Sequence, residues 1–148
     1  MQVRYETADF GDEPASMDAA EAGRPPSEDY HIYGTVFLEH PGQPELAIYD
    51  DLLFLVPSLC ATAPEALESS GDAEVSLVDW PNVYRLRTTG DEVHVTGQQG
   101  EDARYPRAEL IASLRDCGTR FSEFLGSVAA THPRFGAKAR SLRNLLGA

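Results

Sequence analysis

The sequence offers few side chains whose types and spacing suit catalysis or metal binding. His31, His40, His94 and His132 lie far apart, and none is paired with a second ligand at a spacing typical of a metal site. The chain has no Gly-x-Ser-x-Gly motif, and the Gly-Gln-Gln-Gly stretch at 97–100 lacks the lysine of a phosphate-binding loop. We therefore expect no catalytic, cofactor-binding or metal-binding residue, and no enzyme.

Two sites with acidic residues remain to be explained. Asp50 and Asp51 resemble an acid–base pair, but they precede the apolar run 52–59, where acids are typical of a helix N-cap and first turn. We expect them to begin a helix. Asp79 precedes the single tryptophan, Trp80, which is either an exposed interface anchor or a plug in the core.

The two cysteines suit a reducing compartment. Cys60 and Cys117 both lie in apolar surroundings, and two cysteines are too few for a disulfide framework. Arg115 and Arg120 flank Cys117, yet this cysteine falls on the apolar stripe of its helix. We expect both thiols to be buried, reduced and inert.

The net charge of −12 is unevenly distributed. Residues 1–80 carry 17 acids and 2 bases, whereas residues 81–148 carry 7 acids and 10 bases. Such a field repels nucleic acid and anionic membranes and favours a basic protein partner. Solubility and adaptation to high salt are alternative reasons for the acidity.

Length and segment composition place the chain among single-domain proteins. Its 148 residues fit one domain, no stretch is long and apolar enough to span a membrane, and the first residues do not resemble a secretory signal. We expect a cytoplasmic protein whose domain spans 1–148. Segment 11–29, with two prolines together and six acids, is expected to be a long acidic loop.

The hydrophobic pattern indicates an α+β fold. Residues 30–39 are apolar on both faces, which predicts a central strand covered on both sides. Pro57 should limit or kink the helix that follows Asp51. Alternating patterns predict further strands, and the apolar stripe from Leu110 to Val128 predicts a long helix starting at Pro106. We expect an antiparallel sheet of about five or six strands packed against this C-terminal amphipathic helix, with short helices. The strand and helix ranges expected besides these are 3–10, 45–49, 65–69, 74–79, 83–88, 92–96, 103–105 and a short basic helix at 137–146.

Three stretches of the chain resemble one family. They are Tyr-Asp-Asp-Leu-Leu-Phe-Leu-Val-Pro-Ser-Leu-Cys at 49–60, Trp-Pro at 80–81 and Asp-Ala-Arg-Tyr-Pro-Arg-Ala-Glu-Leu at 102–110. Over about residues 30–128 the chain resembles small uncharacterised bacterial proteins grouped with the immunity proteins of polymorphic toxin and contact-dependent competition systems. The resemblance implies an acidic cytosolic α+β protein that neutralises a toxin domain by covering its active site, and it carries over no catalytic residue. Segments 11–29 and 134–148 depart from the family pattern.

These observations give three hypotheses. The first is a non-catalytic immunity protein whose acidic surface binds a basic toxin domain, for example a nuclease. The second is an adaptor or regulatory module that self-associates, with the acidic half of one copy against the basic tail of another. We expect the chain to be a monomer or a weak homodimer. The third is a small-molecule-binding protein or an enzyme with a scattered site. The candidates for the partner-binding surface are Asp50, Asp51, Glu65, Glu68, Asp72, Glu74, Asp79 and Trp80.

Overall fold

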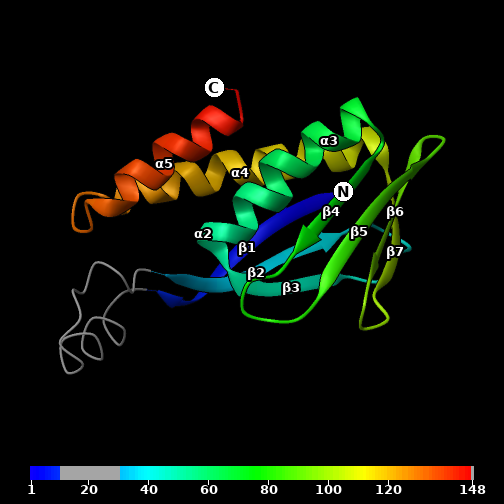
Figure 1. Cartoon of the computed structure of the whole chain (residues 1–148), viewed down its shortest axis with the longest axis horizontal. Helices are drawn as coiled ribbons and strands as arrows, with labels where there is room; N and C mark the ends of the chain where they lie inside the picture. Colours follow the sequence, from blue (N-terminus) through cyan, green and yellow to red (C-terminus); the bar gives the residue numbers. More distant parts are fainter. Residues whose placement is uncertain (11–30, 148) are drawn as a thin grey trace.

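The computed structural model of the chain describes residues 1–10 and 31–147. The acidic segment predicted at 11–29 lies outside the described residues. The chain forms two antiparallel sheets and a set of helices, which Figure 1 shows in the order of the sequence. The strands are β1 (Gln2–Phe10), β2 (Ile32–Glu39), β3 (Leu46–Asp51), β4 (Asp72–Ser76), β5 (Val83–Thr89), β6 (Glu92–Gly97) and β7 (Asp102–Pro106). The helices are α2 (Leu52–Val56), the π-helix η2 (Pro57–Thr62), α3 (Ala63–Ser69), α4 (Arg107–Val128) and α5 (Arg134–Leu145).

The first sheet has the strand order β1-β2-β3, so the predicted central position of β2 is confirmed. Val36 of β2 pairs with Tyr5 on one side and Ile48 on the other. Alternate residues of β2 are buried, whereas its second face is only half-buried. On that face the Arg4 guanidinium lies 4.0 Å from the centre of the Phe37 ring. The prediction of full coverage on both faces was therefore wrong, because a cationic side chain covers this face in place of a second layer of structure.

Gly34 allows the close approach of three segments at the middle of this sheet. A Cβ atom at this position would lie 2.2 Å from the carbonyl oxygen of Glu6 and 2.7 Å from Cδ1 of Leu52. Both distances are too short for any side chain, so β1 and α2 can pack against β2 here only because the residue is glycine.

A continuous helical segment connects the two sheets. Asp51 caps its start, since the Asp51 carboxylate accepts a hydrogen bond from the backbone N–H of Leu53 at 3.1 Å. The cap is therefore the second acid of the pair, one residue later than predicted. Pro57 limits the α-helix as predicted, since α2 ends at Val56, but the chain continues through the wider turns of η2 into α3.

The second sheet has the order β4-β5-β6-β7 and confirms the alternating strands of the C-terminal half. Tyr84 and Leu86 are buried, whereas Arg85 and Arg87 are exposed. The α+β class and the antiparallel pairing are confirmed, but the strands divide into two sheets, where one was expected. Helices α2, η2 and α3 are the reason, because they carry the chain away from β3 before β4 begins.

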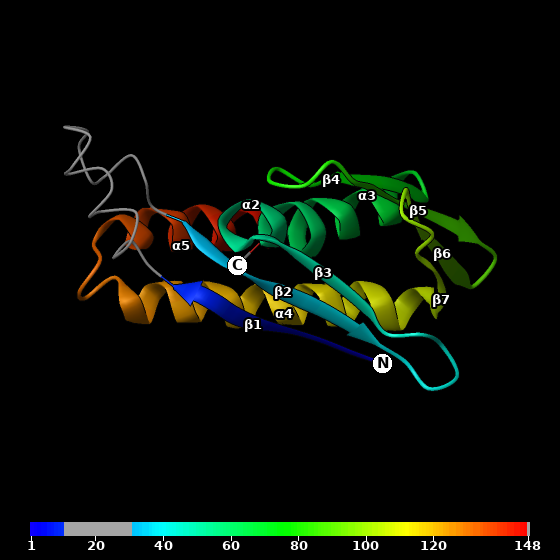
Figure 2. The same cartoon turned by 90° about the horizontal axis from the view of Figure 1, so that it is seen from below.

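The long helix α4 packs its predicted apolar stripe against both η2 and β1 (Figure 2). Pro106 is its N-cap, in agreement with the predicted start, and α5 packs beside it through the buried Phe135. Helix α5 begins at Arg134, three residues before the predicted basic helix. Cys60 and Cys117 are both buried, as predicted, and a hydrogen bond to Cys117, together with burial, raises the pKa of Cys60.

Candidate protein-binding face

The eight predicted interface residues differ sharply in exposure. Asp50 and Asp51 are 1% and 5% exposed, so the prediction that they lie on a binding surface was wrong. Both carboxylates are needed locally, because each accepts hydrogen bonds from backbone N–H groups. The other six residues are exposed, on α3, on β4 and in the loop that follows β4. They are Glu65, Glu68, Asp72, Glu74, Asp79 and Trp80.

Asp50 fixes the loop formed by residues 77–82, which joins β4 to β5. Its Oδ2 atom lies 2.9 Å from the backbone nitrogen of Val78, and its Oδ1 atom lies 3.0 Å from that of Asp79. A buried carboxylate that accepts two N–H groups holds them more strongly than a neutral acceptor does. The 77–82 loop is therefore tied to the end of β3.

A second polar network holds the far end of the same loop. The buried Asn82 side chain donates to Glu101 Oε2 at 2.7 Å and accepts from the backbone nitrogen of Gln98 at 2.9 Å. The Tyr84 hydroxyl donates to the same Glu101 oxygen at 2.7 Å. Burial raises the pKa of Glu101, but the hydrogen bonds from Tyr84 and Asn82 outweigh it, so the pKa is lowered. The 77–82 loop is thus anchored at both ends.

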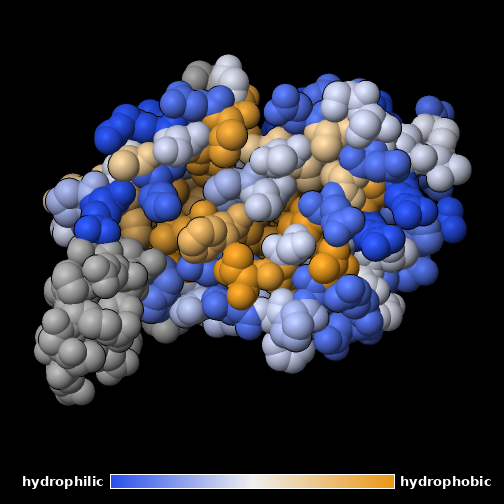
Figure 3. Space-filling model, viewed as in Figure 1, coloured by the Kyte–Doolittle hydropathy of each residue, from blue (hydrophilic) through white to orange (hydrophobic). Residues whose placement is uncertain are grey.

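The anchored loop places apolar side chains on the surface next to the aromatic residues of the first sheet. Tyr49, Val78 and Trp80 are 52%, 55% and 53% exposed. The rings of Tyr33 and Tyr49 are nearly parallel, at 16°, with their centroids 6.3 Å apart. We call Tyr33, Tyr49, Val78, Asp79 and Trp80 the aromatic face. Hydrophobic residues gather across the middle of the molecule in Figure 3, over α2 and the β4–β5 loop, with hydrophilic residues around them.

Asp79 connects the loop to the first sheet electrostatically. Burial, followed by a hydrogen bond with Asp79, raises the pKa of Tyr33 to about 12. The buried Asp51 and the neighbouring Tyr49 contribute smaller effects in the same direction. The His31 ring packs on Tyr33 with its centroid 4.4 Å away. The aromatic face therefore combines tyrosine rings with negative charge.

The other exposed acids fall into paired and unpaired groups. Glu68 forms an ion pair with Arg115, and Glu74 lies 3.9 Å from Arg85. Within the part of the chain that the structure describes, Glu65, Asp72 and Asp79 form no ion pair. Exposed pairs contribute little to stability. The unpaired acids leave the negative field of this half of the molecule open to a cationic partner.

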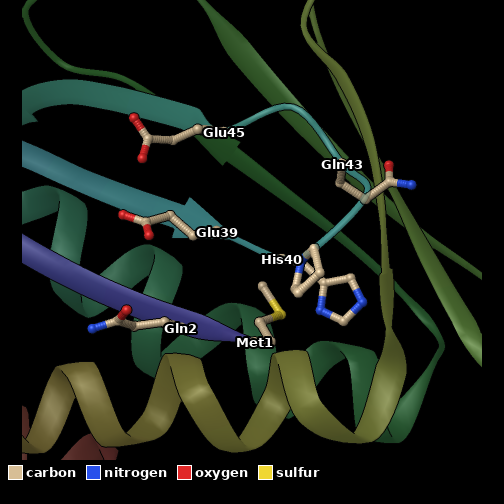
Figure 4. Close-up of a pocket in the computed structure, with 7 residues that line it drawn as sticks. Met1, Gln2, Glu39, His40, Gln43 and Glu45 are labelled. Atoms are coloured by element: carbon tan, nitrogen blue, oxygen red, sulfur yellow. The ribbon is translucent and has the colours of Figure 1, made fainter.

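A separate depression of about 530 Å³ lies where the start of β1 meets the β2–β3 turn (Figure 4). None of the eight predicted residues lines it. Glu39 and Glu45 extend from neighbouring strands here, and Arg4 lies 2.8 Å from Glu39. The hydrogen bond from Arg4 lowers the pKa of Glu39, and the hydrogen bond between the two carboxyls raises that of Glu45. The two carboxyls therefore lie close enough to shift each other's pKa, and no exposed aromatic ring lines the depression.

Sequence reasoning missed Tyr33, Tyr49 and Val78. A signal for Tyr49 was present, because Leu46 and Ile48 alternate with it and point inward. Val78 carried no signal, since its exposure follows from the contact between its backbone and Asp50. The proximity of Tyr33 to Asp79 brings a strand of the first sheet next to the β4–β5 loop of the second sheet.

The described residues contain no group of three His, Cys, Asp or Glu side chains placed to hold a metal ion. No helix in 1–10 or 31–147 has the length and apolar character to cross a bilayer. Comparisons with models of protein families, with curated proteins and with solved structures find no match for this chain. The site must therefore be interpreted from its own geometry.

Proposed function

We propose that this protein is an immunity protein that binds a basic toxin domain through the aromatic face. One observation carries the proposal: Tyr49, Val78 and Trp80 are each about half exposed, yet the loop beneath two of them is held by a buried carboxylate. Solvated loops do not need such anchoring. A fixed apolar surface is what a partner requires, because a preorganised surface loses little entropy on binding.

The composition of the face supports a protein partner. Trp and Tyr are enriched among the residues that dominate binding energy, and they act best near the centre of an interface. Acids around this centre accelerate association with a basic partner through long-range attraction. The resemblance to immunity proteins supplies the class of partner, a toxin domain, with nucleases as the basic example.

The proposal is tested by co-expression with the toxin domains encoded upstream of the gene. The wild-type protein should restore growth and co-purify with one of them. A Tyr49→Ala/Trp80→Ala double variant should fail in both assays. Leu145→Ala is the matched control, because Leu145 is 51% exposed but lies on α5 and outside the face. Failure of the wild-type protein to bind any of these toxins would contradict the proposal.

Self-association is the second candidate function, and α5 favours it. Lys138, Arg140 and Arg143 are exposed on this helix, and its first and last turns carry no acid. The helix of one copy could therefore lie against the acidic half of another. Light scattering should then show a dimer at low salt that dissociates at high salt. A monomer under both conditions would exclude this alternative.

A further inference from the structure

Two aromatic rings elsewhere in the protein form cation–π contacts with basic side chains. The Arg4 guanidinium lies 4.0 Å from the centre of the Phe37 ring. The Lys138 ammonium lies 5.7 Å from the centre of the half-exposed Phe54 ring. Both distances are within the range of about 6 Å in which a ring face attracts a cation. The half-buried Phe37 ring and the half-exposed Phe54 ring are thus each covered by a cation of the chain itself.

The aromatic face contains aromatic rings and negative charge, but in the part of the chain that the structure describes no cationic side chain covers its rings. Within residues 1–10 and 31–147, no Lys or Arg lies over Tyr49 or Trp80. The Asp79 carboxylate lies beside Tyr33 and forms no ion pair in this part of the chain. The buried Asp51 is close enough to act on the same phenol. A cation placed here would meet two nearly parallel rings and a carboxylate together.

We infer that Tyr33, Tyr49 and Asp79 form a subsite for one arginine side chain of the partner. A guanidinium suits it better than an ammonium, because the planar group stacks on a ring and offers paired donors to a carboxylate. This inference rests on the proposed function and names the group by which the partner is recognised.

The test needs no toxin. The full chain, labelled with ¹⁵N, is titrated with N-acetyl-arginine methylamide at pH 7.5, and parallel samples receive the citrulline and lysine analogues. Citrulline has almost the shape of arginine without its charge. We expect the arginine analogue to shift the amide signals of Tyr49 and residues 77–82 and to saturate in roughly the millimolar range, because a cation–π contact and a charge-assisted hydrogen bond act together. The citrulline analogue should bind at least tenfold more weakly, and the lysine analogue at least threefold more weakly.

Two variants and one control locate the subsite. Asp79→Asn removes the charge, and Tyr49→Leu removes a ring while keeping an apolar side chain. Each should weaken arginine binding at least fivefold. Glu123→Gln, an exposed charge change on α4, should leave it unchanged. Dispersed amide signals confirm that each variant is folded.

Three results would overturn the inference. These are equal shifts from arginine and citrulline, equal affinity for lysine and arginine, and shifts that spread over Glu65, Glu68 and Asp72 instead of the face. The proposed function is contradicted by a different result, namely that the wild-type protein binds no toxin. If the protein binds the arginine analogue at this face but binds no toxin, the subsite is supported and the immunity function is rejected.

Discussion

The Asp50 carboxylate lies 2.9 Å from the backbone nitrogen of Val78, although the two residues are 28 positions apart and Val78 lies in the loop that joins two strands of the other sheet. The same carboxylate accepts the N–H of Asp79 at 3.0 Å. A buried acid of the first sheet therefore determines where the 77–82 loop of the second sheet lies. The aromatic face depends on this contact.

Removal of the Asp50 carboxylate should loosen the loop. We expect Asp50→Ala to lower the free energy of unfolding by about 2–3 kcal/mol, because two hydrogen bonds to a charged acceptor are lost. Urea denaturation measures this change. The fluorescence anisotropy of Trp80, the single tryptophan, should fall in the folded variant. Glu65→Ala, an exposed change on α3, is the control, and equal stability and anisotropy in Asp50→Ala and wild type would contradict the role of Asp50.

The contact between Asp79 and Tyr33 should be visible in the titration of the phenol. Burial and the Asp79 hydrogen bond raise the pKa of Tyr33 to about 12, so Asp79→Asn should lower it towards the ordinary value near 10. NMR of ¹³Cζ-labelled tyrosine, assigned with Tyr33→Phe, measures it. The stability that this shift contributes is present below about pH 10 and is lost as the pH rises through about 12. An unchanged titration in Asp79→Asn would show that the two groups do not interact.

The interaction between the Glu39 and Glu45 carboxyls predicts a pH-dependent stability. The hydrogen bond with Glu39 raises the folded-state pKa of Glu45 above 4.5, so this contribution is present below pH 4.5 and is lost as the pH rises through the raised pKa. Glu45→Gln keeps a donor to Glu39 at every pH. The free energy of unfolding of the variant, relative to wild type, should therefore increase between pH 4 and pH 7. A difference that is constant over this range would show that the two carboxyls do not interact.

Two glycines provide a matched pair for the packing of the first sheet. Gly34→Ala should lower the free energy of unfolding by about 1–3 kcal/mol or prevent folding, because its Cβ would lie 2.2 Å from the Glu6 carbonyl oxygen. In Gly126→Ala on α4, the nearest atom is 3.9 Å from the new Cβ, and the better helix former should add about 0.5–1 kcal/mol. Thermal denaturation compares the two. A Gly34→Ala protein as stable as wild type would contradict the close packing of β1, β2 and α2.

Much of the secondary structure could be predicted because local periodicity determines it. The apolar stripe from Leu110 to Leu125 identified α4, and the alternation around Tyr84 and Val93 identified β5 and β6. The division into two sheets could not be predicted, because it depends on how the helices between β3 and β4 pack against α4. The periodicity of apolar residues along the sequence does not indicate which distant segments pack together.

The site was predicted less well than the fold. Asp79 and Trp80 were identified from their chemistry, and the structure places both on the surface. Asp50 was correctly singled out, but its role is internal, because backbone N–H groups 28 and 29 residues away bind its carboxylate. Tyr33 and Tyr49 join the face through strand pairing and the position of the loop, and both are tertiary relationships.

The most direct test of the central claim is calorimetric titration of the wild-type protein and the Tyr49→Ala/Trp80→Ala variant with the toxin domain encoded upstream. Both variant side chains are exposed, so the thermal stability of the variant should match that of wild type. We predict tight binding by wild type and by Leu145→Ala, and a loss of at least about 100-fold in the double variant, as for paired hot-spot residues. Equal affinity of the double variant and wild type, or no binding by wild type, would contradict the account.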